Sequence, residues 1–163
     1  MATVATPMGA EPVNTLSASG SYTGKVRHIK IASGYGTGIF YGDFVKLVNT
    51  GTVEKDTGTS SLTPVGVFVG CSYTDPSTSQ LTFNQQFPAS TAADDIMAYV
   101  VDDPNVVMQM QSSGVLSQTE LGNNIAVVQT GGSTSIGRSK NPLGDTGATT
   151  NTLPMRIIEF VEG

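Results

Sequence analysis

The chain has 163 residues and a formal net charge of -5, and only 13% of its residues are charged. It has no Trp, one Cys and one His. These numbers exclude an intrachain disulfide framework, a cysteine-based zinc site and a multi-histidine metal site, and the acidic balance speaks against direct nucleic-acid binding.

The commonest residues are Thr (21), Gly (19) and Val (17), and this usage predicts an all-β fold. β-Branched residues suit strands, and Gly supplies tight turns. No run of 18 apolar residues occurs, so no membrane-spanning segment is expected. Residues 1–20 lack the basic and apolar regions of a signal peptide.

Residues 1–25 are expected to form an extended N-terminal arm that is unordered by itself. They are mostly Ala, Thr, Ser, Gly and Pro without a helical or strand period, and such a stretch buries too little apolar surface to offset its ordering entropy. An ordinary mobile terminus is the alternative. Scattered apolar residues could anchor an arm on a partner surface, namely Val4, Met8, Val13, Leu16 and Tyr22.

Charge is divided unevenly along the chain. Residues 1–31 carry three basic residues and one acidic residue, whereas residues 32–163 carry five basic and twelve acidic residues. The cations Lys25, Arg27 and Lys30, with His28 among them, therefore make a basic patch that precedes an acidic body.

Residues 26–163 are expected to form a single β domain of short strands separated by turn signals, which favours a compact barrel-like or sandwich fold. The predicted strands are residues 26–31, 39–48, 52–56, 64–74, 80–87, 95–102, 105–111, 125–129 and 154–161. The segment 52–56 is expected to lead to an exposed tip, and Gly42-Asp43 to form a bulge or bend.

Two segments depart from this strand pattern. Ser117–Glu120 fits a capping box, and Gly122 limits any helix there to a single short turn. Residues 130–152 are a long Gly/Ser/Thr loop with Ile136 and Leu143 as its large aliphatic anchors, and loops of this length are usually functional or mobile.

Few residues in the chain suggest chemistry. The carboxylate pairs Asp94-Asp95 and Asp102-Asp103 could act as a glycosidase acid and base or bind a cation, but each stands beside turn formers, where Asp is ordinarily a cap. Cys71 in a Val-rich strand is expected to be a small buried hydrophobe. Gly34–Gly38 lacks the Lys and Ser or Thr of a phosphate loop. We therefore expect neither an enzyme nor a bound cofactor or metal.

Several blocks of the sequence resemble small head proteins of tailed phages that infect marine and freshwater bacteria, namely the capsid decoration, or cement, proteins. The resemblance covers roughly residues 29–130 and the last strand. The blocks are IFYGDFVKL (39–47), GVFVGCSYTD (66–75), FPAST (87–91), AYVVDDP (98–104) and residues 155–161. None of them is a catalytic or ligand signature.

The resemblance implies a β-tulip or β-barrel-like domain on the outer surface of the virion head. It implies a homotrimer at threefold and quasi-threefold axes that clamps neighbouring major capsid subunits, often with an N-terminal arm. The arm anchors named above and the basic patch would then contact the capsid. The alternatives are another virion component, such as a tail, neck or receptor-binding protein, and a carbohydrate-binding domain.

Overall fold

The computed structural model describes residues 7–17 and 22–161 and is all-β, which confirms the predicted fold class. Within these residues the only helix is the 3-10 turn η1 at Gln118–Glu120. The strands are β1 Glu11–Thr15, β2 Arg27–Lys30, β3 Phe44–Leu47, β4 Val53–Lys55, β5 Gly66–Thr74, β6 Leu81–Asn84, β7 Met97–Val101, β8 Val106–Gln109, β9 Asn124–Ile125 and β10 Met155–Arg156.

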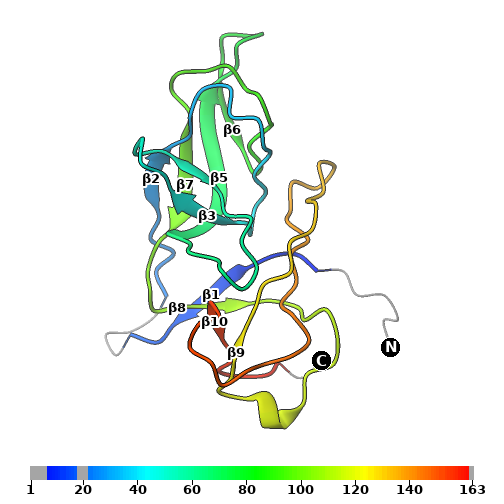
Figure 1. The fold of residues 1–163 in the computed structure, drawn as a ribbon. Helices are drawn as coiled ribbons and strands as arrows, with labels where there is room; N and C mark the ends of the chain where they lie inside the picture. The colour runs from blue at the N-terminus through cyan, green and yellow to red at the C-terminus, as the bar shows by residue number, and fades with distance from the viewer. Residues whose placement is uncertain (1–6, 18–21, 162–163) are drawn as a thin grey trace.

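A six-stranded antiparallel sheet forms the upper body of the molecule (Figure 1). Its order is β2-β7-β5-β3-β4, and β6 also pairs with β5. The long strand β5 is central because it pairs with β7 along one edge and with β3 and β6 along the other. Gly66 lets β7 approach closely, since a Cβ at this position would overlap the carbonyl oxygen of Val101.

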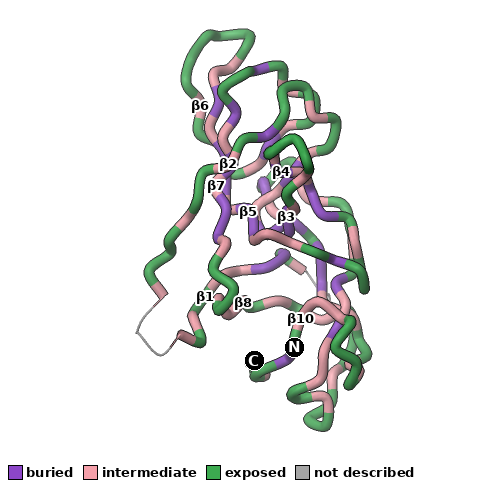
Figure 2. The backbone as a smooth tube through the Cα atoms, turned by 60° about the vertical axis from the view of Figure 1, so that its left-hand side comes forward, coloured by how far each residue is buried: buried purple, intermediate pink, exposed green. Residues whose placement is uncertain are grey.

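The main core packs against this sheet and combines buried strand residues with buried residues of the connecting segments. Its large side chains include Phe68, Phe87, Ile39, Ile96 and Val100, all of which are fully buried. Burial is concentrated along the central strands of the upper body (Figure 2). The β-branched and aromatic residues that predicted strands therefore also supply the core.

The lower body contains two small sheets, β1–β8 and β10–β9 (Figure 1). A second apolar cluster joins it to the upper sheet, with Phe44 and Val67 from that sheet packed near Ala10, Leu62 and Val127. Methionine and leucine side chains complete this cluster, namely Met108, Met110, Leu143 and Met155.

The expectation of an unordered arm differs from the structure over residues 8–15. Ala10 is fully buried and its N–H donates to the carbonyl oxygen of Gly42, while β1 pairs with β8 of the same chain. The β8 partners of β1 lie far along the sequence, so inspection of residues 1–25 alone could not reveal the pairing. The expected anchor Val4 lies outside the described residues.

Two further expectations are corrected by burial. Ile136 is 61% exposed and anchors nothing, whereas the polar residues Ser139 and Asn141 of the 130–152 loop are buried. The segment 52–56 does not end in an exposed tip, because Lys55 and Asp56 are both buried. In both places the buried polar side chains are hydrogen-bonded or ion-paired.

Candidate interaction groove

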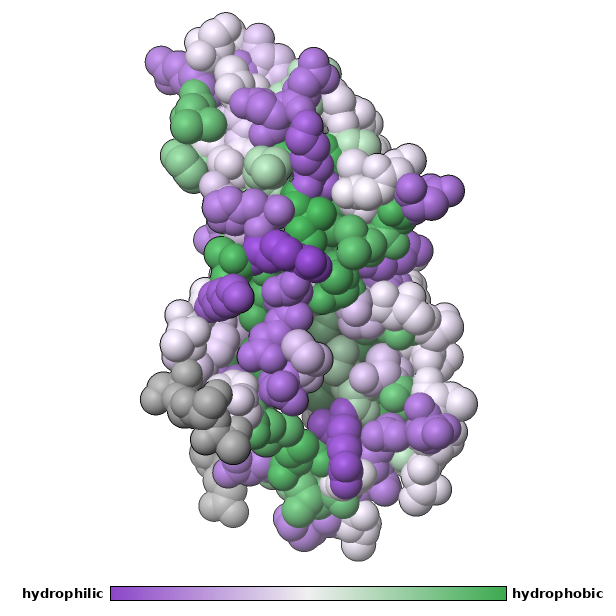
Figure 3. Space-filling view, turned by 90° about the vertical axis from the view of Figure 1, so that its left-hand side faces the viewer, coloured by the Kyte–Doolittle hydropathy of each residue, from purple (hydrophilic) through white to green (hydrophobic). Residues whose placement is uncertain are grey.

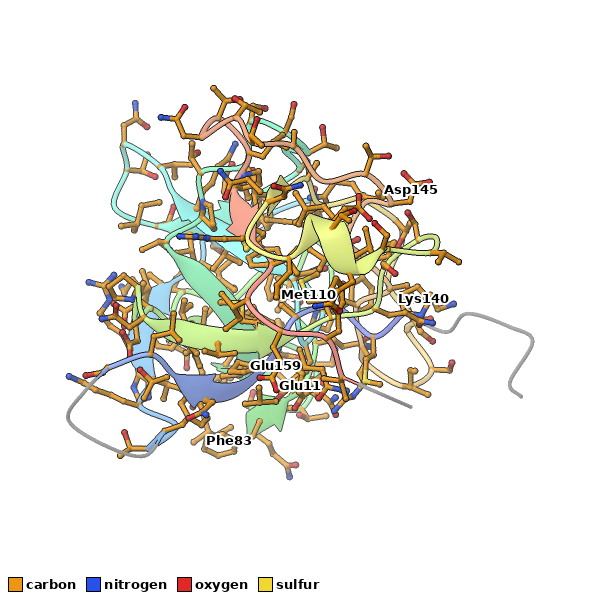
Figure 4. The ribbon with its side chains drawn as sticks, turned by 90° about the horizontal axis from the view of Figure 1, so that it is seen from below. Glu11, Phe83, Met110, Lys140, Asp145 and Glu159 are labelled. Atoms are coloured by element: carbon orange, nitrogen blue, oxygen red, sulfur yellow. The ribbon has the colours of Figure 1, made fainter. Side chains whose placement is uncertain are left out.

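An apolar groove of about 700 Å³ opens in the lower body. It lies between β1, β8 and the segments 110–116 and 156–161. In the view from below, Glu11, Met110 and Glu159 mark its position (Figure 4). Several exposed hydrophobic side chains line it, namely Met8, Val13, Val115, Ile158 and Val161.

Methionine gives this groove an adaptable lining. Met8, Met108 and Met110 are half of the six methionines in the chain, and all three line it. The thioether side chain is flexible and polarizable, so it fits irregular apolar partners. Val115 is 95% exposed and Val161 72% exposed, so a partner that covers them gains roughly 25 cal/mol for each Å² of apolar surface removed from water.

The structure brings two predicted arm anchors, Met8 and Val13, into this groove. Leu16 is exposed beyond it. On the surface, hydrophobic residues (green) cluster at the middle of the molecule and again near its lower end (Figure 3). Met8 and Val13 thus belong to a groove that the folded body shapes, rather than to a free arm.

A polar contact holds the N-terminal strand beside the groove. The Glu11 carboxylate accepts hydrogen bonds from the Tyr41 hydroxyl and from Arg138, each at 3.0 Å, and the Arg138 guanidinium lies over the Tyr41 ring. Burial, followed by the hydrogen bond to Glu11, raises the pKa of Tyr41 to about 12. Burial and the nearby charge of Glu11 also raise the pKa of Tyr22, another predicted anchor.

The predicted basic patch lies elsewhere, on and beside the edge strand β2. Arg27 forms an ion pair with Asp102 at 2.8 Å, and the His28 ring lies 4.6 Å from that of Tyr99. His28, Lys30 and Lys25 are exposed. Charged residues on an edge strand also discourage pairing with strands of other molecules, and this protection is a structural role that the patch can fill.

Strand register places part of this patch beside a second apolar surface. Lys30 pairs with Met97, and Met97 pairs with Ser72. Ser72 in turn pairs with Phe83 of β6, which is 69% exposed. The outer face of the upper sheet therefore combines a cation at one edge with exposed aromatic and aliphatic side chains at the other.

The two aspartate pairs are not brought together. They flank the two ends of β7, and the six residues 96–101 separate Asp95 from Asp102 by roughly 20 Å of largely extended chain. Asp95 accepts hydrogen bonds from the hydroxyl and N–H of Thr74, which lower its pKa in that order of importance. No group of three or more possible metal ligands occurs among the described residues.

Cys71 is buried in β5, as expected, and its thiol donates to the carbonyl oxygen of Gln86 at 3.4 Å. Burial raises the pKa of the thiol to about 12. The neutral thiol is a poor nucleophile, so this residue behaves as part of the core.

Sequence reasoning missed a buried polar cluster beneath the 130–152 loop. The Asp43 carboxylate lies 2.9 Å from the Lys55 ammonium, and its other oxygen accepts from the Asn141 side chain at 3.1 Å. The exposed fractions are 0% for Asp43, 8% for Lys55 and 1% for Asn141. An Asp inside an apolar strand pattern was the one signal available, and nothing in the sequence indicated its partners.

None of the described segments forms a helix long and apolar enough to cross a membrane. No family model matches the chain, and neither a curated protein nor a solved structure matches it.

Proposed function

We propose that this protein is a virion structural protein, a capsid decoration protein that binds the outer surface of a phage head and joins neighbouring major capsid subunits. The observation that carries the proposal is the open, methionine-lined groove, into which the predicted anchors Met8 and Val13 project. A surface of this kind suits attachment to a protein partner. The choice of the major capsid protein as this partner comes from the resemblance of the strand blocks to capsid decoration proteins.

Binding only the expanded head would stabilise it by mass action, because the free energy of binding would lower the free energy of the expanded lattice alone. The exposed face with Lys30 and Phe83 offers a second contact, either to a neighbouring capsid subunit or to another copy in a trimer. One contact on the upper body and one on the lower body would allow a single molecule to bind two capsid subunits at once.

The first test is the number of copies in purified virions. A decoration protein is expected in hundreds of copies for each head, measured by quantitative mass spectrometry and located by electron microscopy. A copy number of a few to a few dozen would assign the protein to the tail or neck instead, and its absence from virions would overturn the proposal.

The second test probes the groove with Val13→Ser. This substitution removes apolar surface at a position that is 45% exposed, so the free protein should fold normally. Binding to heads stripped of the protein is expected to weaken about tenfold, which corresponds to about 1.4 kcal/mol. Ile136→Ser is the matched control, because Ile136 is 61% exposed and lies outside the groove. Equal binding by both variants would contradict a role for the groove.

A further inference from the structure

The buried cluster of Asp43, Lys55 and Asn141 has the composition and arrangement of a self-acylating site. We propose that it forms a covalent amide bond between the Lys55 Nζ and the Asn141 Cγ, with release of ammonia. This inference stands on the cluster alone and does not depend on the proposed function.

Proximity is the first requirement, and Asp43 supplies it. One carboxylate oxygen contacts the Lys55 Nζ at 2.9 Å and the other contacts the Asn141 Nδ2 at 3.1 Å. Both reacting side chains are therefore held on one small group, and the fold has already met the entropic cost of bringing them together. Lys55 ends β4, whereas Asn141 comes from the 130–152 loop.

The second requirement is a neutral amine, and a proton transfer within the cluster would supply it. All three side chains are nearly or fully removed from water, and the Lys55 Nζ lies 5.9 Å from the centre of the Phe40 ring. An ion pair in such surroundings loses most of its hydration. Transfer of one proton across 2.9 Å from Lys55 to Asp43 produces a neutral amine, which is the nucleophilic form, and a neutral carboxyl group.

The third requirement is a polarised acceptor. The Asn141 Oδ1 accepts a hydrogen bond from the Thr130 N–H at 2.7 Å. A backbone donor aimed at this oxygen stabilises the negative charge that develops when the amide carbon is attacked. The Gln129 Oε1 also accepts from the Asn141 Nδ2 at 3.1 Å and helps to hold the amide in this orientation.

The reaction balances without a cofactor or oxidant. The neutral Lys55 amine attacks the Asn141 Cγ to form the C–N bond, and proton transfer through Asp43 converts the Nδ2 into ammonia as its bond to Cγ breaks. Starting from the ion pair, the products are a secondary amide, one ammonia molecule and a protonated Asp43. Asp43 is thus the catalytic residue, because it exchanges protons with both reacting groups.

The neighbouring sequence suppresses a competing reaction at the same residue. Asparagine usually loses ammonia when the N–H of the next residue attacks its side chain, but Pro142 has no N–H. Attack by the Lys55 amine on Cγ is then the route by which Asn141 releases ammonia.

The experiment is intact mass spectrometry of the purified full-length protein, followed over time after expression and again after denaturation. We expect the mass to fall below the calculated value by one ammonia. We also expect trypsin to leave the bond after Lys55 uncut and to release a branched peptide that joins Lys55 to Asn141. The calculated mass with free Lys55 in the folded protein would overturn the proposal, as would ammonia loss that maps to another residue.

Variants separate this chemistry from simple packing. Asp43→Asn and Asn141→Ala are expected to retain the full calculated mass. Asp56→Asn is the matched control, because Asp56 is also buried but its carboxylate accepts from the N–H groups of Gly58 and Thr63 rather than from Lys55 or Asn141. It should still lose ammonia, and failure of this folded control to do so would count against a specific role for Asp43. The wild-type mass decides the question even if a variant fails to fold.

Discussion

Tyr41 connects the N-terminal strand to the body through a single hydroxyl group. Its ring lies under the Arg138 guanidinium, and its hydroxyl donates to Glu11. No sequence pattern pairs these three residues, because they come from β1, the turn before β3 and the 130–152 loop. Only the folded chain brings them together.

Removal of this hydroxyl by Tyr41→Phe is expected to lower the free energy of unfolding by about 1 kcal/mol near neutral pH, the usual net value of one hydrogen bond. The folded-state pKa of Tyr41 is raised from 10.0 to about 12. Its stabilising contribution is therefore complete below pH 10 and is lost as the pH rises towards 12. Urea unfolding of both proteins across this range should show the difference between them shrinking, and a difference that grows with pH would contradict the contact.

Asp43 shows how a single buried residue can escape sequence analysis. The pattern predicted a bend at Gly42-Asp43, and a turn does occur there, since the Asp43 carboxylate accepts from the Phe40 N–H at 2.9 Å. The same carboxylate also reaches Lys55 and Asn141. Local spacing can predict the turn, but it carries no information about partners from distant segments.

At the scale of elements, the strands of the upper sheet fall within their predicted ranges, although β3 covers only 44–47 of the predicted 39–48. The predicted last strand, 154–161, shrinks to β10 at Met155–Arg156. Residues 130–152 form a loop as predicted, but the contacts that hold this loop were not predicted. Strands such as β5 and β7 can be predicted because they are runs of β-branched and aromatic residues bounded by turn residues. The loop has no such period, and its structure depends on polar contacts: Asn141 bonds to Asp43, and Glu120 accepts from the Gly147 N–H at 2.9 Å. The predicted capping box is present, as the Ser117 N–H donates to the same Glu120 side chain.

Gly132 tests how tightly this loop packs on the body. A Cβ at Gly132 would overlap the ring of Phe40, which lies beside Lys55. Gly132→Ala is therefore expected to destabilise the protein by about 1–3 kcal/mol, as overpacking usually does. Gly131→Ala is the control, because a Cβ there meets nothing within 4 Å. Equal stability of the two variants in chemical denaturation would show that the loop can move away from Phe40 at no cost in stability.

At the scale of the whole molecule, the N-terminal segment is part of the fold rather than an appendage. β1 pairs with β8, Ala10 enters the second core cluster, and Glu11 contacts the 130–152 loop. A deletion that removes these residues would disturb the lower body and the groove together. Loss of head binding by such a deletion would therefore not identify an arm contact.

Two truncations should distinguish these regions. Deletion of residues 1–15 removes β1 and is expected to lower Tm by roughly 5–10 °C, corresponding to a few kcal/mol in a chain of this size. Deletion of residues 1–7 leaves Ala10 and β1 in place and should change Tm little. Thermal unfolding followed by circular dichroism makes the comparison, and equal Tm values for the two truncated proteins would show that β1 contributes nothing to stability.

The sequence by itself determined the all-β class, the order of most strands, the short turn at Ser117–Glu120 and the burial of Cys71. Each of these follows from local side-chain preference and spacing, which act over a few residues. The tertiary structure alone decided that β1 joins β8, that Met8 and Val13 line a groove, and that Asp43 meets Lys55 and Asn141. These contacts join segments far apart in the chain, and their partners are selected by the packing and hydrogen bonding of the whole molecule.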